Sequence, residues 1–270
     1  MNKSSADSSC SPDSSASQNI FRTKNCKPTR FAIACGGTGG HMYPGVAVAN
    51  ALKAKGSEVA LVLSGRAVEG NRPAGWDGEV ISVPCMQPHF KSPLLAFASL
   101  VSLVKSFFIA LIRFRKFRPH ALLAMGSYTS FGPVLAARIS GTAVVLHDSN
   151  AIPGVAVSKL SHFARIVCVA FDEAVRYLPV SVNTTNTGMP IRMDITEQDP
   201  GEYADPSRFT ILVMGGSQGA KKLNKKVADA IALLDKDPGE ASALRIIHLA
   251  GRKNEAEVRS LYGRISNIPV

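Results

Sequence analysis

A cluster of glycines followed by a histidine is the part of this sequence best suited to chemistry. It reads Gly36-Gly37-Thr38-Gly39-Gly40-His41 and follows a short apolar segment that is expected to be a buried strand. Glycines let the backbone take positive φ and approach a ligand closely, and a helix that begins beside them directs its unpaired N–H groups at the same place. The cluster therefore predicts a turn that holds a phosphate or a sugar.

The residues also leave a second interpretation open, in which the cluster is only a flexible connection between a strand and a helix. The helix itself is predicted by the apolar spacing of residues 46–52, with Pro44 in its first turn. His41 favours a functional turn because an imidazole exchanges a proton near neutral pH, although a histidine in a turn is more often a hydrogen-bonding spacer.

Composition and charge narrow the class of protein. The chain has 270 residues, 46% of them hydrophobic, which is enough to bury a sizeable core, and we expect two domains. Its net charge of +11 suits a nucleic acid, an anionic membrane or a phosphorylated substrate. Aromatic residues make up only 7% and no recognition motif for nucleic acid is present, so we expect no nucleic-acid partner.

The cysteines and the first residues indicate a cytosolic setting. The five cysteines are scattered and contain no C-x-x-C pair, so they predict neither a disulfide framework nor a zinc site. Residues 1–29 are rich in Ser, Asp, Asn and Lys and lack an apolar run, so we expect a disordered tail and not a signal peptide.

Apolar segments with strand character alternate with helical segments through residues 30–190. This alternation predicts an α/β domain with a doubly wound parallel sheet, in which ligands lie at the carboxyl ends of the strands. The loops at residues 126–133 and 147–154 then lie at the same edge as the glycine turn. After the first strand, the expected strands cover residues 58–63, 79–83, 121–125, 143–146 and 166–170.

The longest apolar segment covers residues 93–117 and ends in a basic stretch. A helix from Leu94 to Ile112 would measure roughly 28 Å, nearly the core of a bilayer. Lys105 near its midpoint would cost about 2.5–3.5 kcal/mol on insertion, which argues against spanning. We expect a helix packed on the sheet with an apolar and basic patch between Leu94 and Arg118 that lies on a membrane surface. The alternative is an ordinary core helix with a solvated basic end.

The pattern restarts after a polar linker at residues 191–208. A strand at 209–214 runs into a second glycine turn, Gly215-Gly216-Ser217-Gln218-Gly219-Ala220, which is followed by a helix at 221–234 and a strand at 245–249. The two glycine turns occur in equivalent strand–turn–helix settings. They predict two nucleotide-fold domains, 30–190 and 209–270, that face each other across a cleft.

Four loops, in this order and spacing, resemble the MurG family of N-acetylglucosaminyltransferases, which make lipid II from lipid I in peptidoglycan synthesis. The resemblance extends over about residues 31–252. It implies a GT-B fold with an N-terminal acceptor- and membrane-binding domain and a C-terminal nucleotide-sugar-binding domain. The loops are Gly36 to His41 with Pro44-Gly45, Gly126-Ser127-Tyr128-Thr129-Ser130, Asn150-Ala151-Ile152-Pro153-Gly154, and Gly215 to Ala220.

The resemblance also implies the reaction and its partners. UDP-N-acetylglucosamine would donate its sugar, with inversion, to the C4 hydroxyl of N-acetylmuramic acid in undecaprenyl-linked lipid I. The family generally needs no structural metal, and no other cofactor is expected. The protein would lie peripherally on the cytoplasmic side of the membrane.

Roles for single residues follow from the resemblance by position. His41 is the candidate general base, which removes the hydroxyl proton; from the residues alone, Asp148 is a rival. The implied UDP-N-acetylglucosamine-binding residues are Thr38, Gly39, Gly40, Asn150, Arg192 and Ser217, of which Asn150 bonds sugar hydroxyls and Arg192 and Ser217 hold the donor diphosphate. The implied acceptor and diphosphate loops contain Gly37, Ser127, Tyr128, Thr129, Gly216, Gln218 and Gly219.

The sequence departs from the family pattern in its loops and at its end. Residues 147–150 read His-Asp-Ser-Asn where the family has His-Glu-Gln-Asn, Met189 replaces an asparagine, and Ser127 replaces a glycine. The chain stops at Val270, whereas the second domain of the family continues into motifs that bind uridine and the donor sugar. We therefore expect an incomplete second domain with an uncovered apolar edge, and little or no sugar transfer by this chain alone.

Two other classes of protein were weighed. A dinucleotide-dependent oxidoreductase would require G-x-G-x-x-G spacing and a carboxylate near residues 63–65, and both are missing. A non-catalytic module that binds a lipid diphosphate at the membrane surface remains open. His147, His248 and the lysines of the helix at 221–234 are expected to be structural or solvated.

Overall fold

The computed structural model describes residues 28–65, 73–87, 92–196, 207–216 and 219–270. Nearly all of the expected tail and much of the expected linker therefore lie outside the described residues. The chain divides into two compact units, Met1–Pro190 and Ile191–Val270.

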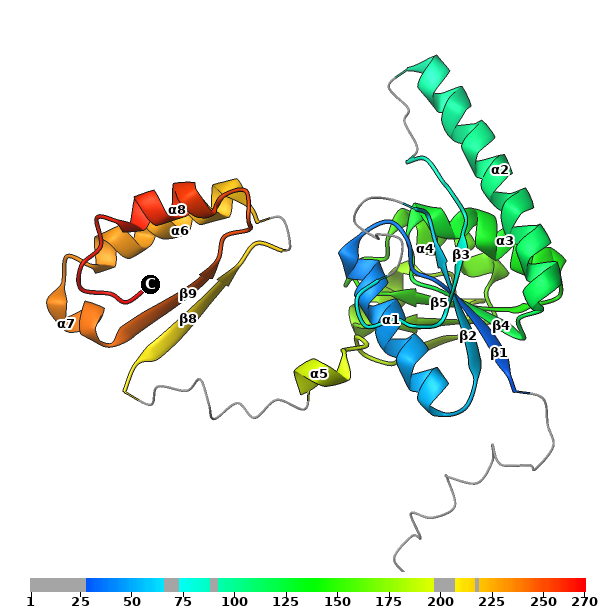
Figure 1. Cartoon of the computed structure of the whole chain (residues 1–270), viewed down its shortest axis with the longest axis horizontal. Helices are drawn as coiled ribbons and strands as arrows, with labels where there is room; N and C mark the ends of the chain where they lie inside the picture. The colour runs from blue at the N-terminus through cyan, green and yellow to red at the C-terminus, as the bar shows by residue number, and fades with distance from the viewer. Residues whose placement is uncertain (1–27, 66–72, 88–91, 197–206, 217–218) are drawn as a thin grey trace, which may run out of the picture. The chain divides into compact units, whose positions relative to one another are not determined.

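The first unit is built on seven parallel strands in the order β3-β2-β1-β4-β5-β6-β7 (Figure 1). The predicted doubly wound parallel sheet is confirmed. β7 was not predicted, because its three residues, Thr-Thr-Asn, are polar and lie at the edge of the sheet. The strands are β1 Arg30–Ala34, β2 Glu58–Leu63, β3 Glu79–Ser82, β4 Ala121–Ala124, β5 Ala143–Asp148, β6 Ile166–Val169 and β7 Thr184–Asn186.

Helices cover both faces of this sheet, so its central strands are almost continuously apolar. α1 (Gly39–Ala54) packs on the face that carries Ile33 and Leu61. The opposite face, with Ala32 and Leu122, packs against α2 (Pro93–Phe117), α3 (Phe131–Ile139) and α4 (Val155–Leu160). The described residues of this unit also include three short 3₁₀ helices at Tyr128–Ser130, Ser161–Phe163 and Asp172–Tyr177.

The helix after the first glycine cluster starts earlier than the sequence predicts. α1 begins at Gly39, so Pro44 lies inside the helix and not in its first turn. The N–H groups of His41 and Met42 both donate to the carbonyl of Thr38, which closes the first turn within the glycine cluster itself. Of the cluster, only Gly37 has a positive φ, 113°.

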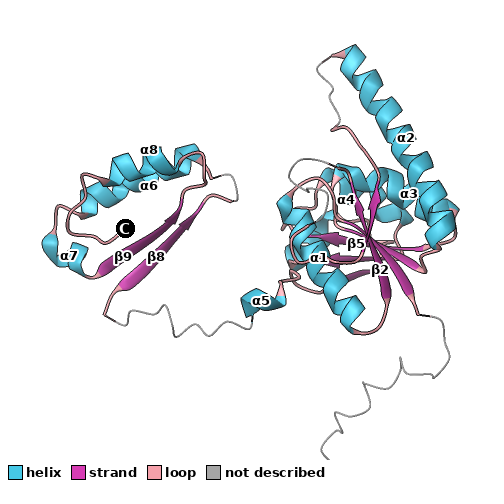
Figure 2. Cartoon of the chain, viewed as in Figure 1, coloured by secondary structure: helices cyan, strands magenta, loops and turns pink. Residues whose placement is uncertain are grey.

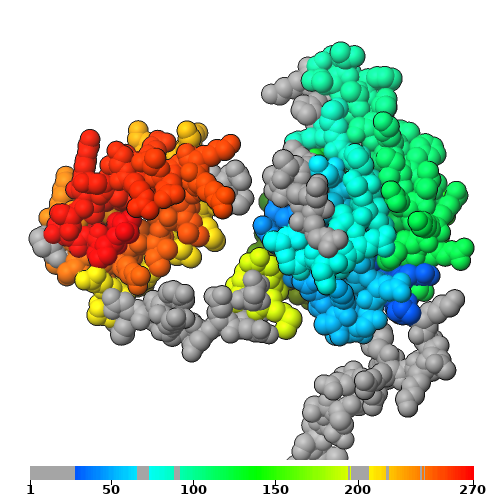
Figure 3. Space-filling model, viewed as in Figure 1, coloured from blue at the N-terminus to red at the C-terminus, as the bar shows by residue number. Residues whose placement is uncertain are grey.

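α2 is clamped at one half and exposed at the other. Gly132 of α3 makes a close crossing possible, because a Cβ there would overlap Ser106 Oγ and lie 2.9 Å from the backbone nitrogen of Phe107. The first half of α2 projects from the rest of the unit (Figures 1 and 3), and Phe97 and Leu100 are 66% and 57% exposed.

Among the described residues, α2 is also the one helix long and apolar enough to cross a membrane, and only 22% of its most apolar window is buried. Ala110, Leu111 and Phe114 pack in the core, whereas most of the other apolar side chains of the helix are exposed, so α2 is a core helix only in part.

The second unit has two parallel strands, β8 (Phe209–Met214) and β9 (Leu244–Leu249), in the described residues. The helices α6 (Lys221–Leu234), α7 (Pro238–Ser242) and α8 (Glu255–Tyr262) cover one face (Figure 2). Leu212, Met214 and Leu249 are exposed on these strands. The predicted incomplete second domain with uncovered apolar surface is thus confirmed. A short helix, α5 (Met193–Thr196), lies within the expected linker.

The packing of α1 on β1 gives a stability prediction. A Cβ at Gly45 would overlap Cys35 Cβ and lie 2.9 Å from its Sγ, so Gly45→Ala should lower the free energy of unfolding by about 1–3 kcal/mol through overpacking. Urea unfolding followed by the fluorescence of Trp76, the single tryptophan, reports on this unit. The control is Gly40→Ala in the same helix, where the nearest atom to a Cβ is Thr38 Oγ1 at 3.8 Å. Equal losses in both variants would contradict the packing argument.

Candidate functional site

Three loops of the first unit meet at the carboxyl edge of β1, β4 and β5, which are neighbours in the sheet. The loops after β1 and β4 are joined directly, because Thr129 Oγ1 donates to the carbonyl of Gly36 at 2.9 Å. The N–H of Met125 donates to the carbonyl of Ala34 at 2.9 Å, which extends the pairing of the two strands toward this edge. The structure therefore brings together loops that are about 90 residues apart in the chain.

The first glycine turn has room for no other residue at Gly37. Its φ of 113° disfavours any side chain, and a Cβ would overlap Ser127 Oγ from the neighbouring loop. Gly39 and Gly40 are the first residues of α1 and Thr38 precedes them, so their N–H groups have no partners within the helix. Thr38 and Gly40 are exposed. The turn thus presents backbone N–H groups and a helix N-terminus to solvent, an arrangement that suits an anion.

His41 is half-buried at the start of α1, close to the carboxyl ends of β4 and β5. Burial lowers the pKa of His41, and the nearby His147 acts in the same direction. The backbone carbonyl of Met125 and the negative charge of Asp148 oppose this effect. The imidazole is therefore held in its neutral form, which can accept a proton.

Asp148 is buried, and its carboxylate is occupied by its own loop. Oδ1 accepts hydrogen bonds from the backbone N–H and the Nδ2 of Asn150, at 2.8 and 3.0 Å, and Oδ2 accepts one from the N–H of Gly154 at 2.9 Å. These three hydrogen bonds fix the loop after β5. Asn150 itself is exposed, with one amide hydrogen engaged in this bond.

Several buried polar atoms beside these loops have no hydrogen-bond partner. They include Nδ1 of His41, Nδ1 of His147, Oγ of Ser130 and Oγ of Ser149. Buried polar groups are normally paired, so this edge is suited to a polar ligand or to bound water. Sequence reasoning missed Ser130 and Ser149, because hydroxyls in loops carry no spacing signal.

The second glycine turn and Arg192 belong to the second unit. Gly216 and Gly219 have positive φ, 81° and 71°. Ser217 and Gln218 lie outside the described residues, so their predicted roles have no structural description. Arg192 is half-buried just before α5.

His147 and His248, which are expected to be structural, both make hydrogen bonds. His147 Nε2 lies 3.0 Å from the carbonyl of Gly188, and His248 is hydrogen-bonded to two side chains of the second unit. Within the part of the chain that the structure describes, no three His, Cys, Asp or Glu residues lie together as a metal site would require.

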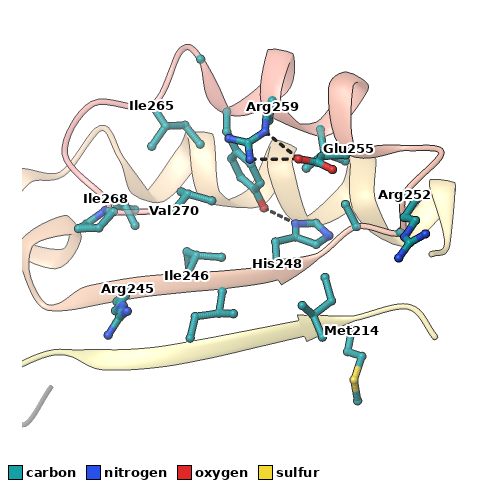
Figure 4. A pocket seen from close by; sticks show the side chains of 18 of the residues that line it. Met214, Arg245, Ile246, His248, Arg252, Glu255, Arg259, Ile265, Ile268 and Val270 are labelled. Carbon is teal, nitrogen blue, oxygen red and sulfur yellow. Dashed lines mark hydrogen bonds and ion pairs between the residues drawn. The ribbon is translucent and has the colours of Figure 1, made fainter. Parts of the chain in front are cut away.

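A cavity of about 1090 Å³ lies in the second unit along the free edge of β9 (Figure 4). Its lining includes Met214, His248 and Arg252, and of the predicted site residues Gly216. On this side of β9, the N–H of Ile246 donates to the carbonyl of Pro269 at 2.9 Å. Among the described residues, a strand pairs with β9 only on its other side, so the cavity is an open groove beside β9.

Comparison with family models assigns the chain. Residues 31–169 match the Glycosyltransferase family 28 N-terminal domain, and residues 210–269 match the Glycosyltransferase family 28 C-terminal domain. The protein therefore belongs to glycosyltransferase family 28.

Named relatives are more specific. The chain is 32% identical over 240 residues to the UDP-N-acetylglucosamine--N-acetylmuramyl-(pentapeptide) pyrophosphoryl-undecaprenol N-acetylglucosamine transferase of Methylobacterium sp. (strain 4-46), covering 86% of this chain and 63% of that protein. It is 33% identical to the protein of the same name from Geotalea uraniireducens (strain Rf4), covering 86% and 64%. The chain thus spans slightly less than two thirds of the length of these relatives.

Solved structures support the predicted GT-B fold. The crystal structure of Acinetobacter baumannii MurG aligns with a TM-score of 0.66 at 24% identity, covering 90% of this chain and 66% of that one. The S. aureus MnaA–UDP co-structure aligns with a TM-score of 0.59 at 13% identity, covering 90% and 68%.

The burial of His41 gives a prediction about pH. The pKa of His41 in the folded state lies below its ordinary value of 6.5. At pH values between the folded and the unfolded pKa, His41 is therefore more protonated in the unfolded chain than in the folded one. Stability is then complete above about pH 7 and falls as the pH drops through the unfolded value toward the folded one. Urea unfolding between about pH 7.5 and 5 should show this loss in the wild type and a smaller loss in His41→Gln. The control is His162→Gln, at an exposed position, which should keep the wild-type slope. An unchanged slope in His41→Gln would contradict the prediction.

Proposed function

We propose that the protein acts in the transfer of N-acetylglucosamine from UDP-N-acetylglucosamine to the C4 hydroxyl of N-acetylmuramic acid in lipid I, giving lipid II. The observation that carries the proposal is a neutral, half-buried His41 beside a phosphate-type glycine turn, at an edge with unpaired buried polar atoms. Family membership and the names of the relatives support the same donor and acceptor.

His41 is the general base in this proposal. The acceptor oxygen attacks the anomeric carbon as the bond from that carbon to the diphosphate oxygen breaks, and the hydroxyl proton passes to the imidazole. UDP leaves with the bonding electrons, and the configuration inverts. The negative charge of Asp148 stabilises the imidazolium that forms, and its three hydrogen bonds make it a positioning residue and not the base.

The two glycine turns provide the diphosphate contacts in the proposal. Thr38, Gly39 and Gly40 present N–H groups at the start of α1, the carbonyl of Gly36 accepts the hydroxyl hydrogen of Thr129, and Gly37 lies close against Ser127. The second turn and Arg192 take the donor diphosphate, Asn150 bonds the sugar hydroxyls, and Tyr128 belongs to the acceptor loops. Helix N-termini and a guanidinium can stabilise the charge of a departing UDP without a metal.

The exposed apolar side of α2, along both halves of the helix, supplies the proposed contact with the cytoplasmic face of the membrane. Leu94, Phe97 and Ile112 are among its exposed apolar side chains. The C-terminal part of the helix carries exposed basic residues up to Arg118, which anionic lipids attract by about 1 kcal/mol each. Such a helix lies on a surface with its apolar side in the headgroup region.

A second candidate function is a module that binds a membrane-anchored lipid diphosphate without catalysis. The observation that favours it is the second unit, which has two strands in its described residues and an uncovered sheet face.

Binding of a water-soluble lipid I analogue, measured by calorimetry, tests the first turn. Gly37→Ala should weaken binding at least about tenfold, because the added Cβ displaces Ser127 and strains the turn. The matched control is Gly56→Ala, which also places alanine at positive φ, 83°, but has no atom within 4 Å and lies at the far edge of the sheet. Equal affinities for the analogue in both variants would overturn the assignment of this turn.

Binding of the sugar donor distinguishes the two candidate functions. Tight binding of UDP-N-acetylglucosamine favours the transferase, whereas binding of the lipid I analogue or vesicles alone favours the non-catalytic module. Radiolabelled transfer to the analogue measures catalysis directly, and turnover would contradict the non-catalytic module.

Sedimentation with vesicles of phosphatidylcholine and phosphatidylglycerol tests the membrane contact. The double variant Phe97→Ser and Phe108→Ser should lower the vesicle affinity about tenfold or more, because two exposed aromatic side chains no longer enter the headgroup region. Ile139→Ser is the control, since Ile139 is equally exposed but lies on α3. Binding should also weaken as salt screens the basic residues. Equal losses in the double variant and the control would contradict the role of α2.

A further inference from the structure

A chain of hydrogen bonds in the second unit links three of its elements. The hydroxyl of Tyr262, on α8, lies 2.7 Å from Nδ1 of His248, on β9, and Figure 4 shows this bond. Nε2 of His248 lies 3.1 Å from Oδ1 of Asn224, on α6. Nδ2 of Asn224 donates in turn to the carbonyl of Ala250 at 2.9 Å. Asn224 is buried, so water cannot replace these partners cheaply.

The partners leave one tautomer for the neutral imidazole. The carbonyl of Ala250 can only accept, so the amide group of Asn224 must turn its nitrogen to Ala250 and its oxygen to His248. Nε2 of His248 must then carry a hydrogen, and in the neutral imidazole Nδ1 accepts the hydroxyl hydrogen of Tyr262. The neutral imidazole is therefore fixed as the Nε2–H tautomer. Burial agrees with this assignment, since it lowers the pKa of His248 and raises the pKa of Tyr262.

The end of this chain of bonds contacts the second glycine turn. A Cβ at Gly219 would overlap the carbonyl oxygen of Ala250 and lie 2.7 Å from Nδ2 of Asn254, which also donates to that carbonyl at 3.1 Å. The N–H of Asn224 donates to the carbonyl of Ala220 at 2.8 Å and so closes the first turn of α6. Gly219 thus packs directly against the carbonyl of Ala250, with no room for a side chain between them.

We propose that His248 is a positioning residue whose single tautomer, through Asn224, sets the place of the Ala250 carbonyl and hence of Gly219 and the start of α6. Only one part of the inference rests on the proposed function, namely that the second glycine turn binds a nucleoside diphosphate. Through these hydrogen bonds, β9 and α8 influence the position of the turn although neither His248 nor Tyr262 contacts the ligand in this proposal. His248 thereby gains a role that its place at the end of a strand does not suggest.

Histidine side-chain NMR on the full chain, labelled with ¹⁵N in histidine, tests the proton assignment directly. The wild type should show His248 as the pure Nε2–H tautomer near pH 7.5, and Asn224→Leu should convert it to a mixture, because Nε2 loses its acceptor. Tyr262→Phe, a conservative change that preserves the ring, should shift the Nδ1 resonance alone. A wild-type Nδ1–H tautomer, or the mixture typical of free imidazole, would overturn the inference.

The consequence for the turn is measured by backbone amide shifts and by UDP affinity. Asn224→Leu removes both side-chain hydrogen bonds of Asn224, to Ala250 and to His248, so it should move the amide signals of Gly219 and Ala220 and weaken UDP binding about tenfold. Lys225→Leu, at an exposed neighbouring position of α6, is the matched control and should leave both unchanged.

Unmoved signals of Gly219 and Ala220 in Asn224→Leu would refute the positioning role. Failure of the wild type to bind UDP, with the tautomer and the amide shifts as expected, would refute the proposed function and leave the positioning role standing.

Discussion

The site of the first unit depends on one constraint, the parallel alignment of β1, β4 and β5, which makes three loops end at the same edge of the sheet. The hydrogen bond from Thr129 to Gly36 is possible only because the two strands run side by side in register. The close contact of Gly37 with Ser127 depends on the same alignment. A loop between antiparallel neighbours would leave at the opposite edge, and the imidazole of His41 would face no second loop.

Much of the fold follows from local patterns in the sequence. The strands are short apolar runs and their helices carry an apolar side, so element type and order could be predicted, and the order then implies a parallel sheet. β7 could not be predicted, because a polar edge strand lacks the apolar run that marks the other strands. The start of α1 was misplaced because glycines and a proline argue locally against helix, whereas the packing of Met42 and Val46 on β1 decides the outcome.

The candidate site was predictable in its turns and less so in its side-chain pairing. Glycine spacing marks where a backbone can approach a ligand, and a histidine beside it is visible in the sequence. The three donors to Asp148 come from its own loop, and their geometry depends on how that loop folds back. The link from Tyr262 through His248 to Asn224 joins residues 14 and 24 positions apart, and no local pattern announces it.

The crossing at Gly132 has a consequence for how this protein can vary. It holds the second half of α2 tightly against α3, whereas the first half extends past the sheet with few buried side chains. The projecting half of α2 can therefore become longer or shorter, or carry different side chains, without disturbing the core. Such changes would leave the edge formed by the loops after β1, β4 and β5 in place.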